Sequence, residues 1–395
     1  MQTCFFTIRM VEFVFLALTL KKLLDSYGVI YKFSKRYSTM EIKRIIYLSS
    51  RTFFSIFNSG NSFMEKEMVR KVRYGILGFG NFAERTIAPA IQASPNSKLV
   101  ALQKRSLTAA AEKARAFQVS LAFDSAEKLA NHPDIDAVFV TSAVVKHAQD
   151  TITAALAGKH VLVEKPMAMN VAEAKQMIEV CRSKNVKLMV GQMVRLSPLI
   201  VRMKELIRSG IIGKVEFVKA EYMYDARLSL RRWMWDKKTA GGGATFDIGV
   251  HCLDTIRFLL DDDVVSVKSQ LAPIPTDTAT EQTSLLALKF SQGTPVSIYC
   301  SFVTSFRRLI IEVVGQEGVL SAENFTFSNL TIPLKIMLGK NGAAAETREE
   351  IIVIPNLYEK EVTLFSESIL NNTALPVPGE EGLKNQIVLD EAMKV

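Results

Sequence analysis

The chain has 395 residues, of which 48% are apolar and 23% charged, a composition typical of a folded globular protein and not of a disordered or fibrous one. The net charge of +9 lies mostly near the N-terminus, because residues 1–71 hold 12 Lys/Arg and 5 Asp/Glu. Residues 72–395 hold 37 basic and 35 acidic side chains and are nearly neutral, so we expect no nucleic-acid partner.

Residues 1–69 form a first segment that does not match the rest of the chain in composition. Its apolar run, Val11–Leu20, is too short to span a bilayer, and no small-residue cleavage site follows it. A weak membrane anchor, a signal peptide and an upstream stretch preceding a true start at Met64 or Met68 remain alternatives. We favour the third, because a strand begins just after Met68, and we expect no firm membrane association.

The next segment predicts a dinucleotide-binding turn. Val72–Leu77 is typical of a short buried strand, Gly78-Phe79-Gly80-Asn81-Phe82-Ala83 follows it directly, and Ala83–Ala93 is helix-like. In this strand–turn–helix context, Gly78 permits a tight turn, Gly80 allows the backbone to approach a pyrophosphate, and the helix N-terminus favours phosphate charge. We therefore expect residues Gly78 to Phe82 to contact the cofactor, the alternative being a purely structural glycine turn.

The end of the second strand indicates which nicotinamide cofactor is bound. The strand Lys98–Gln103 is followed by Lys104-Arg105-Ser106, where an NAD enzyme commonly has an Asp or Glu for the ribose hydroxyls. A basic pair and a hydroxyl suit a 2′-phosphate, so the sequence favours NADP over NAD. The alternative is that Lys104 and Arg105 are solvated loop charges.

Strands and helices continue to alternate up to Gly191, which predicts a parallel, doubly wound sheet. The expected elements are helices at Thr108–Phe117, Ser125–Asn131, Ala148–Ala157 and Ala172–Lys184 and strands at Leu121–Phe123, Ala137–Thr141, His160–Glu164 and Lys187–Gly191. Ligands bind outside the carboxyl ends of such strands. Thr141, Ser142, Glu164 and Lys165 fall at those ends, and His147 follows one of them, near the expected nicotinamide, where it orders the loop or contacts the cofactor.

After Gly191 the pattern changes to long strands with few helices, which predicts an α+β domain built on a large, mostly antiparallel sheet. The expected helices are Pro198–Ser209, Ala244–Leu260 and Leu383–Val395, and the expected strands are Val215–Tyr224, Val264–Leu271, Thr283–Phe290, Pro295–Phe302, Arg308–Val314, Val319–Glu323 and Leu330–Met337. We therefore divide the chain into the extension 1–69, a Rossmann domain 70–191 and a substrate and oligomerisation domain 192–395.

Three polar residues of this second half share one face of the predicted helix Ala244–Leu260. Asp247, His251 and Asp254 lie at positions i, i+4 and i+7 after the triple glycine Gly241–Gly243. Two of them could face Lys165 across a cleft, and Lys and His are suited to proton transfer because burial shifts their pKa toward neutrality. A helix cap at Asp247 and an ordinary half-buried His251 are the alternatives, and we interpret Asp254 as a surface charge.

The loop before this helix supplies candidates for a sugar pocket. Arg232, Trp233 and Trp235 lie together, and aromatic faces suit the C–H surfaces of a sugar, although both Trp residues could equally be core residues. Cys4, Cys181, Cys252 and Cys300 form no CxxC motif and no cluster with His, so we expect reduced buried thiols and no metal site.

These motifs resemble the Gfo/Idh/MocA oxidoreductase family over about residues 70–395. The resemblance rests on Gly78-x-Gly80-x-x-Ala83, on Gly158 through Glu164-Lys165-Pro166, and on Gly241 through Asp247-x-x-x-His251. It implies a Rossmann domain packed on a mostly β domain, with Lys165 near nicotinamide and substrate, often beside a cis-Pro peptide. It also implies that Asp247 and His251 face the reacting carbon, with His251 as acid/base.

Within that family the chain looks most like the NADP-linked aldose dehydrogenases and dihydrodiol dehydrogenases, through Ile87–Ile91 and the Lys104-Arg105-Ser106 strand end. It departs from the family at Thr141-Ser142-Ala143, where Thr-Pro-Asn is common. The sequence thus predicts a cytoplasmic NADP-dependent dehydrogenase, with NAD possible, acting on a sugar or cyclic polyol as a homodimer or homotetramer. A non-catalytic nucleotide sensor and an NAD-assisted glycoside hydrolase are the alternatives.

Overall fold

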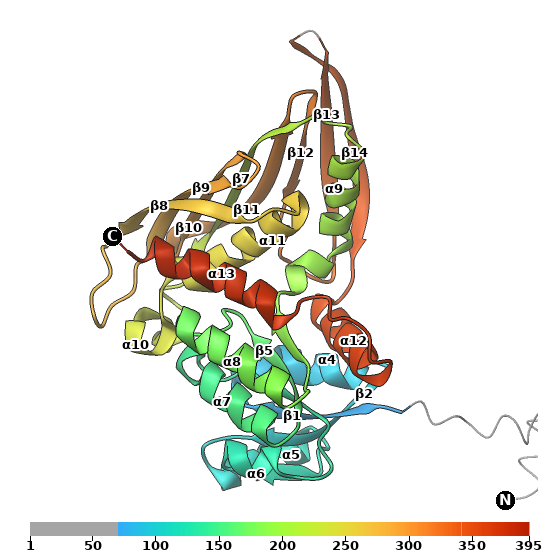
Figure 1. Ribbon diagram of the computed structural model, residues 1–395, viewed down its shortest axis with the longest axis vertical. Helices are drawn as coiled ribbons and strands as arrows, with labels where there is room; N and C mark the ends of the chain where they lie inside the picture. The colour runs from blue at the N-terminus through green and yellow to red at the C-terminus, as the bar shows by residue number, and fades with distance from the viewer. Residues whose placement is uncertain (1–69, 341, 395) are drawn as a thin grey trace, which may run out of the picture. The chain divides into compact units, whose positions relative to one another are not determined.

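The computed structural model describes residues 70–340 and 342–394, and within them the chain forms two sheets with helices packed on them (Figure 1). The extension 1–69, with its apolar run and Cys4, lies outside the described residues. The predicted fold class, a Rossmann sheet followed by a large and mostly antiparallel sheet, is confirmed.

The first sheet is parallel throughout, with six strands in the order β3-β2-β1-β4-β5-β6 among the described residues. Its strands are β1 (Val72–Leu77), β2 (Ser97–Gln103), β3 (Leu121–Phe123), β4 (Ala137–Val140), β5 (His160–Glu164) and β6 (Leu188–Gly191). All of them lie where the alternating pattern predicted a strand. The order reverses between β1 and β4, and ligands of doubly wound sheets bind at such a switch point.

Helices cover both faces of this sheet, as a parallel sheet requires because its strands are apolar on both sides. They are η1 (Ala83–Ile87), which continues as α4 (Ala88–Ala93), then α5 (Leu107–Ala116), α6 (Ala126–Ala130), α7 (Val144–Leu156) and α8 (Val171–Ser183). The central strand β4 is fully buried along its whole length. The first helix was predicted as one α-helix, but its first turn, η1, has π-type hydrogen bonding.

The second sheet has eight strands in the order β14-β13-β12-β11-β7-β10-β9-β8, within residues 215–354. These strands are β7 (Val215–Asp225), β8 (Val264–Ala272), β9 (Thr283–Phe290), β10 (Pro295–Ser301), β11 (Val303–Gly315), β12 (Gly318–Glu323), β13 (Leu330–Lys340) and β14 (Ala343–Ile354). Neighbouring strands are antiparallel except β7 and β10, which pair in parallel.

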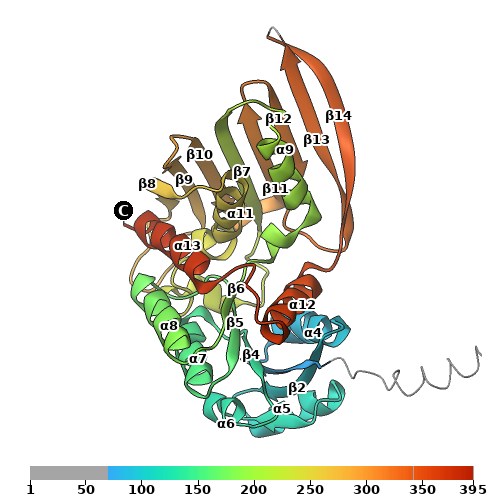
Figure 2. The ribbon, with the colours of Figure 1, turned by 45° about the vertical axis from the view of Figure 1, so that its right-hand side comes forward.

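Residues of the second sheet alternate between buried and exposed, most clearly along β9, so one face packs on helices and the other does not within the described chain. The covering helices are α9 (Pro198–Arg208), α11 (Val250–Leu260) and α13 (Gly379–Ala392). Short helical segments η2 (Met193–Leu196), η3 (Arg232–Trp235), α10 (Lys237–Ala240) and η4 (Thr245–Gly249) connect them. Figure 2 shows α9 and α11 against one face of the second sheet and α13 between that sheet and α8.

Two elements near the C-terminus were not predicted, namely β14 and α12 (Leu357–Leu370). β14 is an edge strand whose middle, from Glu346 to Glu350, holds four charged residues, so it lacks an apolar strand pattern. Helix α12 leaves the second sheet and packs on α4 and β1 of the Rossmann sheet. The predicted last helix is confirmed as α13, which begins at Gly379 and contacts α8.

Among the described cysteines, Cys181, Cys252 and Cys300 are buried free thiols, as predicted. No helix within residues 70–340 and 342–394 combines the length and apolar character needed to cross a bilayer.

Candidate active site

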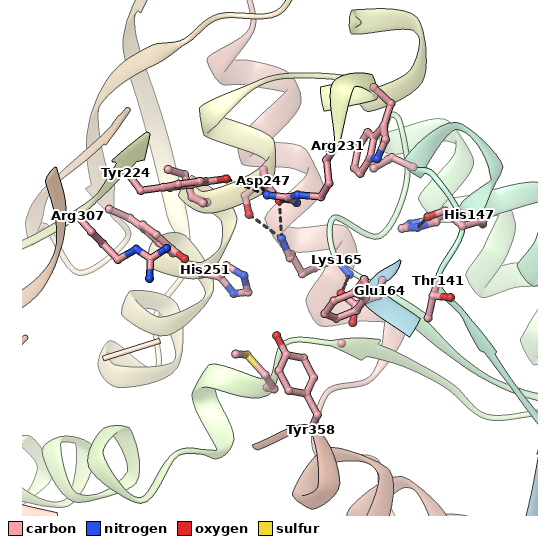
Figure 3. Close-up of a pocket in the computed structure, with 18 residues that line it drawn as sticks. Thr141, His147, Glu164, Lys165, Tyr224, Arg231, Asp247, His251, Arg307 and Tyr358 are labelled. Carbon is pink, nitrogen blue, oxygen red and sulfur yellow. Dashed lines mark hydrogen bonds and ion pairs between the residues drawn. The ribbon is translucent and has the colours of Figure 1, made fainter. Parts of the chain in front are cut away.

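A cavity of about 360 Å³ opens at the carboxyl ends of β4 and β5, where the Rossmann half meets the second sheet (Figure 3). Thr141, Ser142, Glu164 and Lys165 line its Rossmann side. Its other side comes from β7, η4, α11 and β11. The predicted strand-end residues and the predicted Asp247 and His251 are therefore brought together in one cavity.

The glycine turn after β1 lies beside the cavity, and Gly78 has a steric reason to be glycine. Its φ is +75°, and a Cβ there would lie 2.5 Å from the Cα of Ser142. A Cβ on Gly80 would meet nothing nearer than 3.8 Å, so the turn is open on that side. Phe79 is buried against Phe117, Asn81 is exposed, and Phe82 lines the cavity.

The basic strand end after β2 lies next to this turn. Lys104 donates a hydrogen bond from Nζ to the carbonyl oxygen of Phe79, at 2.7 Å, so its charge is placed over the glycine turn. Arg105 is exposed, and the Ser106 hydroxyl caps α5 by accepting from the backbone N–H of Ala109 at 3.4 Å. Lys104 is thus positioned beside the turn, Arg105 follows it in the chain and faces solvent, and Ser106 has a structural partner.

The loop after β4 is held by hydrogen bonds from two of its own side chains and from His147 of α7. The Thr141 hydroxyl donates to the carbonyl of Leu77 at 2.9 Å, and the Ser142 hydroxyl donates to Asp150 at 2.7 Å. Both ring nitrogens of the buried His147 lie 2.9 Å from backbone carbonyl oxygens, those of Ser142 and Pro166. Burial lowers the pKa of His147 to about 4, so the ring is neutral near pH 7 and donates one of these bonds.

At the end of β5, Glu164 and Lys165 point into the cavity (Figure 3). Glu164 is 8% exposed, and its Oε1 is buried without a hydrogen-bond partner among the described residues. Burial raises the pKa of Glu164 to about 7, against the opposing effect of the Lys165 charge. The peptide bond between Lys165 and Pro166 is cis, as the family resemblance implied.

The second wall depends on the triple glycine before η4. The Gly243 N–H donates to Glu281 Oε2 and the Thr245 N–H to Glu281 Oε1, both at 2.9 Å, so one buried carboxylate caps the helix start. A Cβ on Gly243 would lie 1.8 Å from the Glu281 carbonyl oxygen, which excludes any larger residue. This close approach fixes the start of η4 and, with it, the position of Asp247.

Asp247 connects the two walls through charged hydrogen bonds (Figure 3). Lys165 Nζ donates to Asp247 Oδ1 at 2.9 Å and to its backbone carbonyl at 2.7 Å. Arg231 donates to the same carboxylate at 3.1 and 3.3 Å and to the Tyr224 hydroxyl at 2.8 Å. Burial would raise the pKa of Asp247, but the charges of Lys165 and Arg231 outweigh burial and hold that pKa below its ordinary value.

His251 lies one helical turn after Asp247 and is 8% exposed. Its Nδ1 is buried without a hydrogen-bond partner among the described residues, and the ring lines the cavity. Burial lowers the pKa of His251 to about 3, and the nearby Lys165 charge lowers it further than Asp247 can offset. The ring is therefore uncharged near pH 7, and one of its two nitrogens can accept a hydrogen bond.

The interpretation of Asp254 as a surface charge was wrong. Asp254 is fully buried, where it pairs with Arg195 and accepts from the Asn385 amide at 2.7 Å. It does not line the cavity, because its partners hold it on the side of α11 that packs on α13 and η2. The sequence spacing showed that Asp254 shares a helix face with His251. It could not show that Arg195 of η2 pairs with Asp254 in a buried position.

Of the three residues predicted to bind a sugar, Trp233 lines the cavity, whereas Trp235 and Arg232 do not. Trp235 packs edge-on against Phe302 at 5.6 Å between ring centroids. Arg232 is exposed and donates to the carbonyl of Arg227 at 3.1 Å, away from the cavity lining.

Several cavity residues were not identified from the sequence, namely Tyr222, Tyr224, Arg231, Arg307 and Tyr358. Tyr222 and Tyr224 are two apart at the end of β7, so their alternation could have placed them on one face. Arg231 adjoins the predicted Arg232, and no local pattern separates the two. Tyr358 belongs to α12, which the sequence did not predict.

The turn and the cavity together fit a nicotinamide dinucleotide. The open Gly80 turn leaves room for a phosphate backbone, the Lys104 ammonium lies over that turn, and the buried Glu164 Oε1 lacks a hydrogen-bond partner among the described residues. Within the described residues no group of three or more His, Cys, Asp or Glu side chains is arranged to hold a metal ion.

Two family models match the chain and together cover more than half of it. Residues 72–192 match the model described as "Oxidoreductase family, NAD-binding Rossmann fold", and residues 200–321 match "GFO/IDH/MocA C-terminal domain".

Curated relatives and solved structures agree with these matches. A 1,5-anhydro-D-fructose reductase of Ensifer adhaerens is 29% identical over 79% of this chain and 92% of its own. A D-xylose 1-dehydrogenase [NADP(+)] of Haloarcula marismortui is 28% identical over 79% of this chain and 87% of its own. The crystal structure of an aldose-aldose oxidoreductase from Caulobacter crescentus superposes with a TM-score of 0.72 at 26% identity, covering 82% of this chain and 98% of that one.

Proposed function

The chain belongs to the GFO/IDH/MocA family of NAD(P)-dependent oxidoreductases, and we propose that it transfers hydride between NADP(H) and a carbon bearing a hydroxyl or keto group in a sugar or cyclic polyol. The observation that carries the proposal is the convergence of Lys165, Asp247 and His251 in one cavity at the carboxyl ends of the Rossmann strands. The names of the sugar-acting relatives support the substrate class.

The proposed roles follow from charge and hydrogen bonding. The bound nicotinamide supplies the hydride acceptor or donor. His251 is neutral and its ring lines the cavity, so it is suited to accept the hydroxyl proton in the oxidising direction. The Lys165 ammonium, positioned by Asp247, stabilises the negative charge that develops on the substrate oxygen.

Asp247 acts as a positioning residue in this scheme. It holds Lys165 at 2.9 Å and Arg231 at 3.1 Å, so one carboxylate orients cations from both walls. Trp233 presents an aromatic surface to the same cavity, where it can pack on the C–H face of a sugar ring.

The preference for NADP is proposed on the basis of Lys104 and Arg105. An exposed guanidinium beside the glycine turn can donate to a 2′-phosphate, and no acidic side chain replaces it at the end of β2. The printed cofactor of the xylose dehydrogenase relative supports the same choice.

We also keep the domain division as part of the proposal, with the extension 1–69, nucleotide binding at 70–191, and substrate binding and assembly at 192–395. The exposed face of the large sheet supports a homodimer or homotetramer, because a one-sided sheet gains stability by covering that face. The free buried cysteines are consistent with a cytoplasmic location.

The direct test measures turnover by the full chain with aldoses, inositols and anhydro sugars, each with NADP and with NAD. The absorbance of the reduced nicotinamide reports the turnover. We expect turnover with NADP and its loss in Lys165→Met. Tight cofactor binding without turnover of any substrate would contradict the proposal and favour a nucleotide sensor.

A further inference from the structure

One charged residue of the cavity has no role in the chemistry proposed above. Arg307 lies at the start of β11, where the pairing with β7 is interrupted. Val303 pairs with Asp225 and Arg308 pairs with Met223, so four residues of β11 lie opposite one residue of β7 and bulge out of the sheet. Bulges re-aim side chains at functional sites, and this one places Arg307 in the cavity lining beside Tyr224 and His251 (Figure 3).

The neighbouring arginine shows what is unusual about Arg307. Arg308 forms an ion pair with Glu221 at 2.9 Å across the sheet. Arg307 has no carboxylate of the described residues at ion-pair distance; its guanidinium instead lies over the rings of Tyr224 and Phe327, at 5.9 and 5.3 Å from their centroids. Stacking on aromatic faces leaves the N–H groups at the guanidinium edge available for an anion.

The carboxylates that line the cavity do not neutralise the positive charge of Arg307. Asp247 already pairs with both Lys165 and Arg231. Glu164 has its pKa raised to about 7 by burial and so carries a partial charge at neutral pH, while His251 is uncharged. Three cations thus face one fully ionised carboxylate and one partly ionised carboxylate, and the excess positive charge lies at Arg307.

We propose that the substrate is a sugar acid, whose carboxylate is bound by Arg307 while the carbon that exchanges hydride lies near Lys165 and His251. This inference rests on the proposed dehydrogenase function and specifies its substrate class. A planar guanidinium matches a carboxylate through two parallel hydrogen bonds, and one such group meets the needs of a single carboxylate. A phosphate dianion would call for further donors, and Arg231, the other guanidinium of the cavity, is engaged by Asp247 and Tyr224.

The test compares sugar acids with neutral sugars that differ from them only at the acidic carbon. The pairs are D-glucuronate with D-glucose and D-galacturonate with D-galactose, and D-glucose 6-phosphate is added as a phosphate probe. For the full chain with NADP, kcat/KM is measured for each substrate, and binding is followed by tryptophan fluorescence, because Trp233 lines the cavity. We expect at least one acid to exceed its neutral partner about tenfold or more in both measurements.

Matched variants assign that preference to a residue. Arg307→Gln is expected to reduce the acid-to-neutral ratio about 10- to 100-fold, with part of it restored in Arg307→Lys, whereas Arg308→Gln keeps the ratio. Arg308→Gln removes the same charge from the adjacent residue, so it controls for general effects of charge and strand packing.

The outcomes separate this inference from the proposed function. Turnover of neutral sugars with no acid preferred, or a preference for the phosphate, would overturn the sugar-acid substrate and leave the dehydrogenase standing. Binding of an acid that depends on Arg307 but without turnover would support the acidic ligand and contradict the dehydrogenase. If no acid binds more tightly than its neutral partner, the inference is wrong.

Discussion

The two walls of the cavity are built in different ways. The Rossmann wall comes from consecutive strand ends, and Thr141, Glu164 and Lys165 all follow from the rule that parallel strands end at one edge. The second wall comes from segments far apart in the sequence: the end of β7, the start of η4 and the bulge of β11. In the proposed scheme, the first wall contributes Lys165 and the cofactor-binding turn, and the second contributes His251 as the proton acceptor together with Arg307.

Under the proposed function, this difference would separate the residues that set the rate from those that select the substrate. Only the ion pair between Lys165 and Asp247, with its hydrogen bond to the Asp247 carbonyl, joins the charged groups of the two walls within the described residues. Changes on the Rossmann wall should therefore affect cofactor use and the rate for every substrate. Changes on the second wall, apart from His251 and Asp247, should alter which substrate is accepted.

The largest expected effect comes from removing the connection between the walls. Lys165→Met keeps the length of the side chain but removes the ammonium that pairs with Asp247 at 2.9 Å. Charge stabilisation and proton handling each contribute about 10²–10⁴-fold, so we expect kcat/KM to fall about 10³-fold or more for all substrates. Steady-state kinetics measure this, with the exposed Lys175→Met as the control. Turnover retained in Lys165→Met would show that the lysine does not act in catalysis.

The second prediction contrasts the two buried histidines, one on each wall. His251→Asn removes the unpartnered ring and should reduce kcat about 10²–10³-fold while the melting temperature changes little. His147→Asn breaks contacts to the Ser142 and Pro166 carbonyls, so it should lower the melting temperature and weaken NADP binding more than it lowers kcat. Thermal unfolding and steady-state kinetics on both variants measure these effects. A larger loss of kcat in His147→Asn than in His251→Asn would contradict the proposed roles.

Sequence alone predicted the Rossmann wall well, because each of its residues follows a short apolar strand and the strand ends share an edge. It also predicted Asp247 and His251, because a helical spacing after three glycines is a local feature. Arg307 could not be found this way, since its direction depends on a bulge defined by pairing with β7. Tyr358 could not be found either, since α12 returns to the Rossmann sheet from the far end of the chain.

Asp254 shows the same limit of prediction from local sequence, because here a residue with the right spacing proved not to belong to the cavity. Its spacing from His251 matched a shared helix face, yet its environment depends on Arg195 and Asn385, which are 59 and 131 positions away. A local period gives the face of a helix, and only the tertiary partners decide whether a charge on that face is buried, paired or exposed.

A smaller effect on kinetics is expected from Arg105, which is proposed to favour NADP over NAD. Arg105→Ala should raise KM for NADP about tenfold, the equivalent of one charge-assisted hydrogen bond, and leave KM for NAD nearly unchanged. The exposed Arg115→Ala on the same side of the sheet is a control of equal charge. An equal loss with both cofactors would mean that Arg105 does not contact a 2′-phosphate.

The last expected effect is on stability and not on kinetics, and it concerns the two carboxylates of the cavity, one from each wall, whose pKa values move in opposite directions. Asp247 is paired with two cations and stays ionised, whereas burial raises the pKa of Glu164 from 4.5 to about 7. A group whose pKa is raised on folding contributes stability below its unfolded pKa and loses that contribution as pH rises through the folded pKa. The effect of Glu164 should therefore be lost between about pH 4.5 and pH 7.

Glu164→Gln removes this titration and keeps the shape of the side chain. Relative to the original chain, the variant should gain stability between pH 5 and pH 8, by at most on the order of 3 kcal/mol for a shift from 4.5 to about 7. Denaturant unfolding at the two pH values measures the difference, with the exposed Glu179→Gln as a control. If the stability difference between the variant and the original chain shrinks as pH rises, Glu164 is held as an ion, like Asp247. The two walls would then shift the pKa of a buried carboxylate in the same direction.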